Sequence, residues 1–147
     1  MISDRHLRVA AIVLALAGLG IAGYLTYVHY EGIHPVCGLG GDCVKVQTSE
    51  WSKLAGIPVA VLGLIGYAVI LVTLFVPGEQ ALIAGALTAL VGFGFSAYLT
   101  YRELFTIDAI CPWCVASAIV MTLLAIVTTA RLMRAPTEQR GAIPYVG

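Results

Sequence analysis

Four long stretches without a charged side chain constrain the fold of this chain more than any other feature. Each is about as long as the roughly 20 apolar helical residues that cross a bilayer core. Only helices and closed barrels satisfy their backbone polar groups in lipid, and these stretches lack the strict alternation of barrel strands. With 60% hydrophobic and 11% charged residues, a soluble domain is excluded. The stretches cover residues 9–28, 57–76, 81–101 and 110–130.

The stretches predict an all-α integral membrane protein, a four-transmembrane-helix bundle built from residues 1–134. A flexible cytoplasmic tail is expected over residues 135–147, where prolines and glycine interrupt the pattern. The first stretch follows basic residues, as in a cleaved signal peptide, but its length and lack of a clear A-x-A site favour a span. We place the spans at about residues 9–29, 57–76, 81–101 and 110–132.

The connections between the spans differ in length. An outer loop of residues 30–56 contains, at residues 44–54, a pattern that predicts a short interfacial helix with Trp51 as its membrane-surface anchor. Residues 77–80 predict a tight turn and residues 102–109 a short outer loop.

Basic residues are distributed unequally between the two ends of the predicted bundle. The positive-inside rule compares the two sides, and an even number of spans puts both termini together. Five arginines flank the termini, against three basic residues on the other side, which favours cytoplasmic termini and outward-facing cysteines. An exported location permits disulfides, which the cytosol generally does not. The two sets are Arg5, Arg8, Arg131, Arg134 and Arg140, and Lys45, Lys53 and Arg102.

The motif Tyr-Leu-Thr-Tyr occurs twice, at residues 24–27 and 98–101. The same offset of 74 residues aligns Cys37 with Cys111. We interpret the halves as copies of one helical hairpin, although apolar helices also match by chance. The offset also pairs glycines that we expect to let helices approach closely, Gly18 with Gly92 and Gly20 with Gly94. Tyr67 and Phe93 are expected to pack or to face lipid rather than to line a ligand pocket.

Cys111-Pro112-Trp113-Cys114 forms a C-x-x-C motif at the predicted outer end of the fourth span. Proline suits the first helical position, which makes Cys111 the cap residue and puts Cys114 in the first turn. Unpaired N–H groups and the helix dipole favour a thiolate there. A thiolate is the reactive form of cysteine, so this pair is a candidate redox centre.

Cys37 and Cys43 form a second pair in the glycine-rich outer loop. Thiol–disulfide exchange needs direct attack of a thiolate on a sulfur, so a mobile loop pair could carry electrons between water and the membrane pair. Two structural disulfides and a four-cysteine zinc site are the alternatives. The wide C-x5-C spacing and the helix-start position disfavour zinc.

The arrangement of these motifs resembles the vitamin K epoxide reductase (VKOR) family over the whole chain except its ends. The resemblance rests on both cysteine pairs and on Ser49, Trp51, Gly56-Ile57-Pro58 and Gly63. It implies a four-helix bundle with a quinone at its outer mouth. It also implies, as in the bacterial branch of the family, oxidation of a thioredoxin-like partner and reduction of a membrane quinone.

By position, Cys37 resembles the cysteine that the partner thiol attacks, and Cys43 the shuttle that attacks Cys111. Cys114 resembles the thiol that faces the quinone. Ser49 matches a family Ser/Thr whose hydroxyl could polarise a quinone oxygen or orient a cysteine, although a serine on a helix surface explains it as well. Trp51 is a further quinone-supporting candidate.

The resemblance also sets expectations for substrate and partner. Animal enzymes of the family place a tyrosine where this chain has Ala118, which favours reduction of an ordinary quinone over vitamin K epoxide. The quinone would be of the ubiquinone, menaquinone or vitamin K type, with no metal and no nucleic acid. Because no fused thioredoxin-like domain is evident, we expect a separate exported DsbA-like partner at a bacterial inner or plasma membrane.

Two rival interpretations have different sequence signatures. The bacterial disulfide-forming membrane oxidases also use four helices and two cysteine pairs, but in them the C-x-x-C comes first, which is the reverse of the order here. A non-enzymatic membrane assembly protein with structural disulfides is the other alternative. Redox potentials separate an enzyme from such a protein, because structural disulfides have potentials below about −300 mV.

Overall fold

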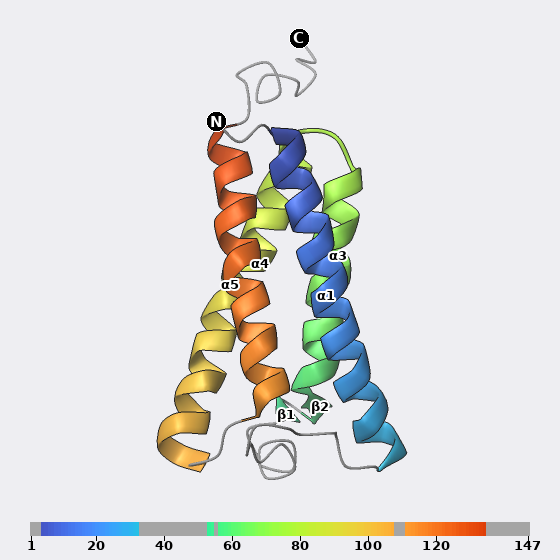
Figure 1. Cartoon of the computed structure of the whole chain (residues 1–147), viewed down its shortest axis with the longest axis vertical. Coiled ribbons are helices and arrows are strands. Elements are labelled where there is room, and N and C mark those ends of the chain that lie inside the picture. Colours follow the sequence, from blue (N-terminus) through green and yellow to red (C-terminus); the bar gives the residue numbers. More distant parts are fainter. Residues whose placement is uncertain (1–3, 33–52, 55, 108–110, 135–147) are drawn as a thin grey trace.

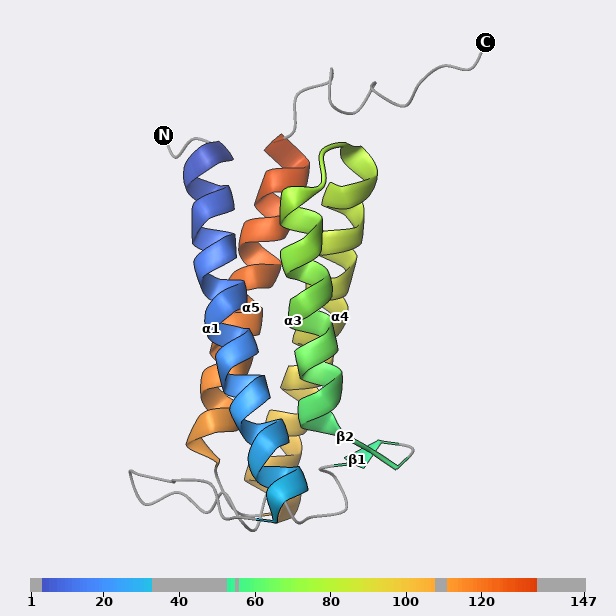
Figure 2. The same ribbon diagram turned by 90° about the vertical axis from the view of Figure 1, so that its right-hand side faces the viewer.

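In the part of the chain that the structure describes, four α-helices are present. They lie side by side along the long axis of the molecule (Figure 1), and the view turned by 90° shows the same arrangement (Figure 2). The computed structural model describes residues 4–32, 53–54, 56–107 and 111–134. Consecutive helices run in opposite directions, so that the start of α1 and the end of α5 lie at the same end. The helices are α1 (Asp4–Glu31), α3 (Val59–Phe75), α4 (Glu79–Arg102) and α5 (Pro112–Arg134).

Each helix packs mainly against two others. Helix α1 contacts α3 and α5, and α4 contacts the same two helices from the other side. The core combines small residues on α1 with larger residues from α3 and α5, and small side chains let membrane helices approach closely. Its buried members are Ala11, Ala15, Ala22, Tyr67, Ile70, Leu74, Ala89, Met121, Leu124 and Ala125.

Two of the four paired glycines lie where helices meet. A Cβ atom on Gly18 would collide with the ring of Tyr67, and one on Gly92 would lie 2.8 Å from Met121. For these two, the expectation of close approach is confirmed. For Gly20 and Gly94 it is wrong, because a Cβ there meets nothing within 4 Å.

Arg8 joins the start of α1 to the end of α3. Its Nε donates a hydrogen bond of 2.8 Å to the carbonyl oxygen of Leu74. Its guanidinium carbon lies 5.7 Å from the centroid of the Phe75 ring. The last carbonyls of a helix have no partner within the helix and carry partial negative charge. The Arg8 guanidinium supplies both a hydrogen-bond donor and a positive charge.

Among the described residues, three helices are long and apolar enough to cross a membrane: Arg5–Glu31, Glu79–Thr106 and Pro112–Arg134. Helix α3 is apolar but shorter, at 17 residues. Large apolar side chains point outward along the helices, including Val13 (60% exposed), Val72 (61%) and Val91 (72%). A surface of this kind suits contact with lipid. The described part of the chain is therefore mostly helical, and three of its helices are candidate membrane spans.

The segment before α3 is a short hairpin. Strand β1 (Lys53–Leu54) pairs antiparallel with β2 (Ile57–Pro58), and Gly56 in the connection has a φ of 83°, which favours glycine. The predicted interfacial helix therefore does not extend to Leu54, because backbone pairing across the turn replaces helical bonds there. Its residues 44–52 lie outside the described part. The predicted span from residue 57 also begins late, since α3 starts at Val59 after Pro58.

The prediction of a short outer loop over residues 102–109 is wrong for most of these residues, because they are helical. Residues Glu103–Ile107 continue α4 as a π-helical turn, η2. The backbone N–H of Glu103 still donates to the carbonyls of Leu99 and Thr100, so the chain winds on without a break. Single π-helical turns within α-helices occur frequently at functional sites.

Candidate functional site

The C-x-x-C motif lies at the first turn of α5. Cys111 directly precedes Pro112, the first residue of the helix, and its carbonyl oxygen accepts a hydrogen bond of 3.0 Å from the N–H of Val115. The predicted positions of Cys111 as cap and Cys114 within the first turn are thus confirmed. Cys111 is fully buried and Cys114 is partly exposed.

Glu103 approaches both cysteines from η2. One of its carboxylate oxygens, Oε2, accepts a hydrogen bond of 3.3 Å from the backbone N–H of Cys111. The same carboxylate is hydrogen-bonded by the side chain of Cys114. The side chain is only 3% exposed and is the one charged side chain among the described residues that is classed as buried. A buried carboxylate is costly unless it is hydrogen-bonded, so these two contacts account for its position.

Trp113, between the two cysteines, packs against α1. Its ring centroid lies 4.7 Å from that of Tyr24, with the rings tilted by 40°. Offset or tilted aromatic pairs of this kind stabilise a contact beyond the area that they bury. The motif is thus held from two sides, by Tyr24 of α1 and by Glu103 of η2.

Further along α5, toward the middle of the bundle, Tyr67 of α3 contacts this helix. Its hydroxyl lies 2.8 Å from both the carbonyl oxygen and the Oγ atom of Ser117, and its side chain is fully buried. The expectation that Tyr67 packs in the bundle is confirmed. Ser117 is three residues after Cys114, so this polar contact lies about one helical turn from the C-x-x-C, on the side toward the middle of the bundle.

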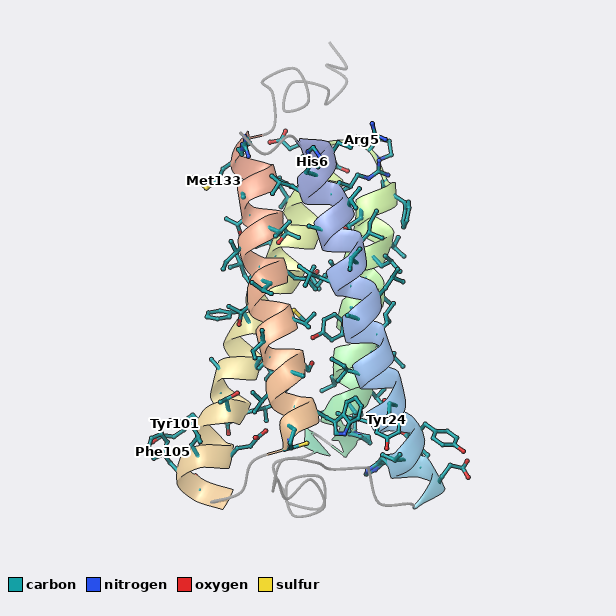
Figure 3. The ribbon with its side chains drawn as sticks, in the orientation of Figure 1. Arg5, His6, Tyr24, Tyr101, Phe105 and Met133 are labelled. Carbon is teal, nitrogen blue, oxygen red and sulfur yellow. The ribbon has the colours of Figure 1, made fainter. Side chains whose placement is uncertain are left out.

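Aromatic side chains gather at the end of the bundle that carries the C-x-x-C. Figure 3 shows Tyr24, Tyr101 and Phe105 at this end and Arg5, His6 and Met133 at the other. The rings of Tyr101 and Phe105 are 5.0 Å apart and more than half exposed, at 55% and 69%. Tyrosines and tryptophans are enriched where a protein crosses the membrane–water interface.

The remaining predicted site residues lie outside the described part of the chain. They are Cys37, Cys43, Ser49 and Trp51. Their roles stay predictions, and only the C-x-x-C half of the proposed relay has a described geometry.

Glu103 is a site residue that the sequence interpretation missed, because it falls within the predicted outer loop of residues 102–109. Two signals pointed to it. It follows a long apolar helix with few charges, and it precedes Cys111 by eight residues. Glu103 lies within the candidate span Glu79–Thr106, and an ionisable residue inside a membrane helix is by default a candidate functional residue.

These observations first define a class: a helical membrane protein with a reactive-type cysteine pair at the start of one helix, beside a buried carboxylate. The model of the family described as "Vitamin K epoxide reductase family" matches residues 9–129, and the chain therefore belongs to that family. Membership supports an oxidoreductase that is integral to a membrane, of the general thiol–quinone kind.

Proposed function

We propose that this protein is a membrane thiol:quinone oxidoreductase that supports disulfide formation in exported proteins. It accepts electrons from a thioredoxin-like, DsbA-like protein at Cys37 and Cys43, relays them to Cys111 and Cys114, and reduces a membrane quinone. The observation that carries this proposal is the geometry of the C-x-x-C turn, with Cys111 buried at the cap and Cys114 bonded to Glu103. Family membership gives the general reaction class.

The chemistry of the turn fits the electron-donating end of such a relay. The first N–H groups of α5 and its dipole favour negative charge at the sulfur atoms of this turn. Cys114 is partly exposed, so a substrate could reach it, while Cys111 is closed off from solvent. The two cysteines therefore differ in accessibility, which suits a different role for each.

The proposed relay is a series of thiol–disulfide exchanges, each by attack of a thiolate on a sulfur. A partner thiolate attacks Cys37 and releases Cys43, which attacks Cys111 and releases Cys114. The partner's second thiol displaces Cys37, which then regenerates the Cys37–Cys43 disulfide and frees Cys111. The reduced C-x-x-C gives two electrons to the quinone. In sum, a partner dithiol and a quinone become a partner disulfide and a quinol.

We further propose that α3 is the fourth membrane span and that both termini are cytoplasmic. An α-helix of this length rises about 26 Å, somewhat short of the roughly 30 Å hydrocarbon core. Flanking residues and local thinning of the bilayer accommodate a difference of this size. Arg5, Arg8, Arg131 and Arg134 all lie at one end of the bundle, the end that the positive-inside rule puts in the cytoplasm. The setting would be a bacterial inner or plasma membrane.

The substrate and the supporting residues follow from the same proposal. The quinone would be of the ubiquinone, menaquinone or vitamin K type, and no metal takes part. Ser49 and Trp51 would support the quinone, with the hydroxyl of Ser49 available as a hydrogen-bond donor. Ala118 on α5 carries no group that could bond a quinone oxygen.

Quinone reduction by the purified protein tests the proposed function. The protein is supplied with a reduced thioredoxin-like partner and a soluble quinone, and quinol formation is followed by absorbance. Cys114→Ala should abolish turnover, because it removes the sulfur that passes electrons on. Thr122→Ala is the matched control on the same helix, since its hydroxyl bonds only to the Ala118 carbonyl of its own helix in the described contacts.

Turnover by Cys114→Ala at the wild-type rate would contradict the proposal. So would redox potentials below about −300 mV for both pairs, which are typical of structural disulfides and would favour a non-enzymatic assembly protein.

A further inference from the structure

Glu103 is the one buried charged side chain in the described part of the chain, and both of its polar contacts are with the redox motif. Cys111 comes eight positions after Glu103, and the π-helical turn η2 at the end of α4 places the carboxylate beside the start of α5. Burying a carboxylate carries a large desolvation penalty, and an N-cap could be made by an uncharged serine or asparagine at much lower cost. Capping alone therefore does not explain a glutamate at this position.

We propose that Glu103 is the proton acceptor for the Cys114 thiol when the reduced C-x-x-C pair gives its electrons to the quinone. This inference rests on the proposed function. The carboxylate is hydrogen-bonded by the Cys114 side chain, and a base must be within hydrogen-bond reach of the proton that it takes. Its second contact, with the N–H of Cys111, holds the carboxylate in place relative to the helix start.

The step balances as follows. The S–H bond of Cys114 breaks and an O–H bond forms on Glu103, leaving a thiolate that donates to the quinone. The Cys111 sulfur loses its own proton and bonds to the Cys114 sulfur, and two electrons pass to the quinone. The proton held on Glu103 and the proton from Cys111 end on the two quinone oxygens. A disulfide and a quinol result, and Glu103 is again a carboxylate.

Other described groups at this end of the bundle make contacts away from the carboxylate. Next to Glu103, the Arg102 guanidinium carbon lies 5.2 Å from the centroid of the Tyr98 ring, and its Nη1 donates to Thr106. From α1, the Tyr24 ring packs on Trp113, and from α3 the hydroxyl of Tyr67 is bonded to Ser117. Of the groups facing Glu103 from α5, Cys111 and Cys114 are the ones that titrate, and Cys114 is the one whose side chain bonds it.

Single-turnover reduction of a soluble quinone by the pre-reduced full-length protein isolates this step from the partner. Glu103→Gln keeps an oxygen that can cap the Cys111 N–H but removes the proton acceptor. At about pH 6.5 the Cys114 thiol that is still protonated must lose its proton before it can donate, and Glu103→Gln leaves only solvent to take that proton. We expect Glu103→Gln to reduce quinone about 100-fold more slowly there, within the usual range for general-base catalysis.

The pH profile separates a proton acceptor from a structural residue. As pH rises toward about 9, solvent deprotonates the thiol directly and the deficit of Glu103→Gln should nearly disappear. A deficit of the same factor at every pH, or no deficit at all, would overturn the inference. Glu31→Gln, an exposed carboxylate at the same end of the bundle, should match the wild type throughout.

Glu103→Asp provides a second measurement if Glu103→Gln does not fold. It keeps a carboxylate but withdraws it by one methylene, so its rate should fall while the shape of the wild-type pH profile remains. A Glu103→Asp profile that rises with the thiolate fraction would also overturn the inference. If the wild-type protein reduces no quinone at all, it is the proposed function that fails, and the two failures are thereby distinguished.

Discussion

At the scale of single residues, Gly18 beside Tyr67 leaves less room for a Cβ atom than any other described glycine. The Tyr67 ring fills the place that a Cβ on Gly18 would take, and its hydroxyl is held by Ser117 on the far helix. The ring therefore has little freedom to move aside. Close packing of this kind makes a single added methyl group costly.

Gly18→Ala should therefore lower the free energy of unfolding by about 1–3 kcal/mol, the usual cost of overpacking. Gly20→Ala is the matched control on the same helix, because a Cβ there meets nothing within 4 Å. It should be neutral or stabilising by up to about 1 kcal/mol, from helix propensity alone. Unfolding of both variants in detergent measures the difference, and equal stabilities would show that the Gly18 contact is not tight.

Tyr67→Phe removes a buried hydrogen bond while keeping the ring. We expect a loss of about 0.5–1.5 kcal/mol in the free energy of unfolding. Because the ring is no longer held by Ser117, adding Gly18→Ala to Tyr67→Phe should cost less than it costs in the wild type. Tyr27→Phe, on an exposed ring, is the control, and strictly additive losses in the double variant would count against a pinned ring.

At the scale of elements, the C-terminal end of α3 depends on α1. Arg8→Gln removes both the hydrogen bond to the Leu74 carbonyl and the stacking on Phe75, so thermal unfolding in detergent should begin a few degrees lower. Arg5→Gln removes an equal charge from an exposed position of the same helix and is the control. If the midpoint falls equally in both variants, the effect comes from the lost charge and not from the contacts of Arg8 with Leu74 and Phe75.

The elements also show where a local pattern is insufficient. The helix start at Pro112 was predictable, because a proline followed by an apolar run is a signal carried within a few residues. The hairpin at β1 and β2 was not, since the polar and apolar residues before Gly56 suit an interfacial helix equally well. The π-helical turn η2 was also missed, because the charged residues Arg102 and Glu103 end the uncharged stretch and indicate a loop. Only the packing of this turn beside α5 shows that the helix continues.

At the scale of the whole molecule, the topology of four spans is open to a direct test. Single cysteines are placed by Tyr30→Cys, Phe105→Cys, Phe75→Cys and Met133→Cys in a background where the four native cysteines are alanine. All four positions are well exposed in the structure. A membrane-impermeant maleimide added to intact cells should label Tyr30→Cys and Phe105→Cys, and should label the other two only after permeabilisation.

The result for Phe75→Cys decides whether α3 spans the membrane. Phe75 ends α3 at the same end of the bundle as the start of α1. Labelling of Phe75→Cys from outside, together with Tyr30→Cys, would show that α3 returns without crossing. Labelling of Met133→Cys from outside would instead reverse the proposed orientation.

The sequence by itself determined that this chain is helical and apolar enough for a membrane, that a C-x-x-C begins one helix, and that the chain resembles the family whose model matches it. These properties depend on composition and on spacing within short segments. The tertiary structure decided that Glu103 is hydrogen-bonded to both cysteines of the motif and that Tyr67 fills the space beside Gly18. It also decided that no neighbouring helix packs closely on Gly20. Those contacts join residues on different helices, and only the packing of the helices against one another determines which side chains meet.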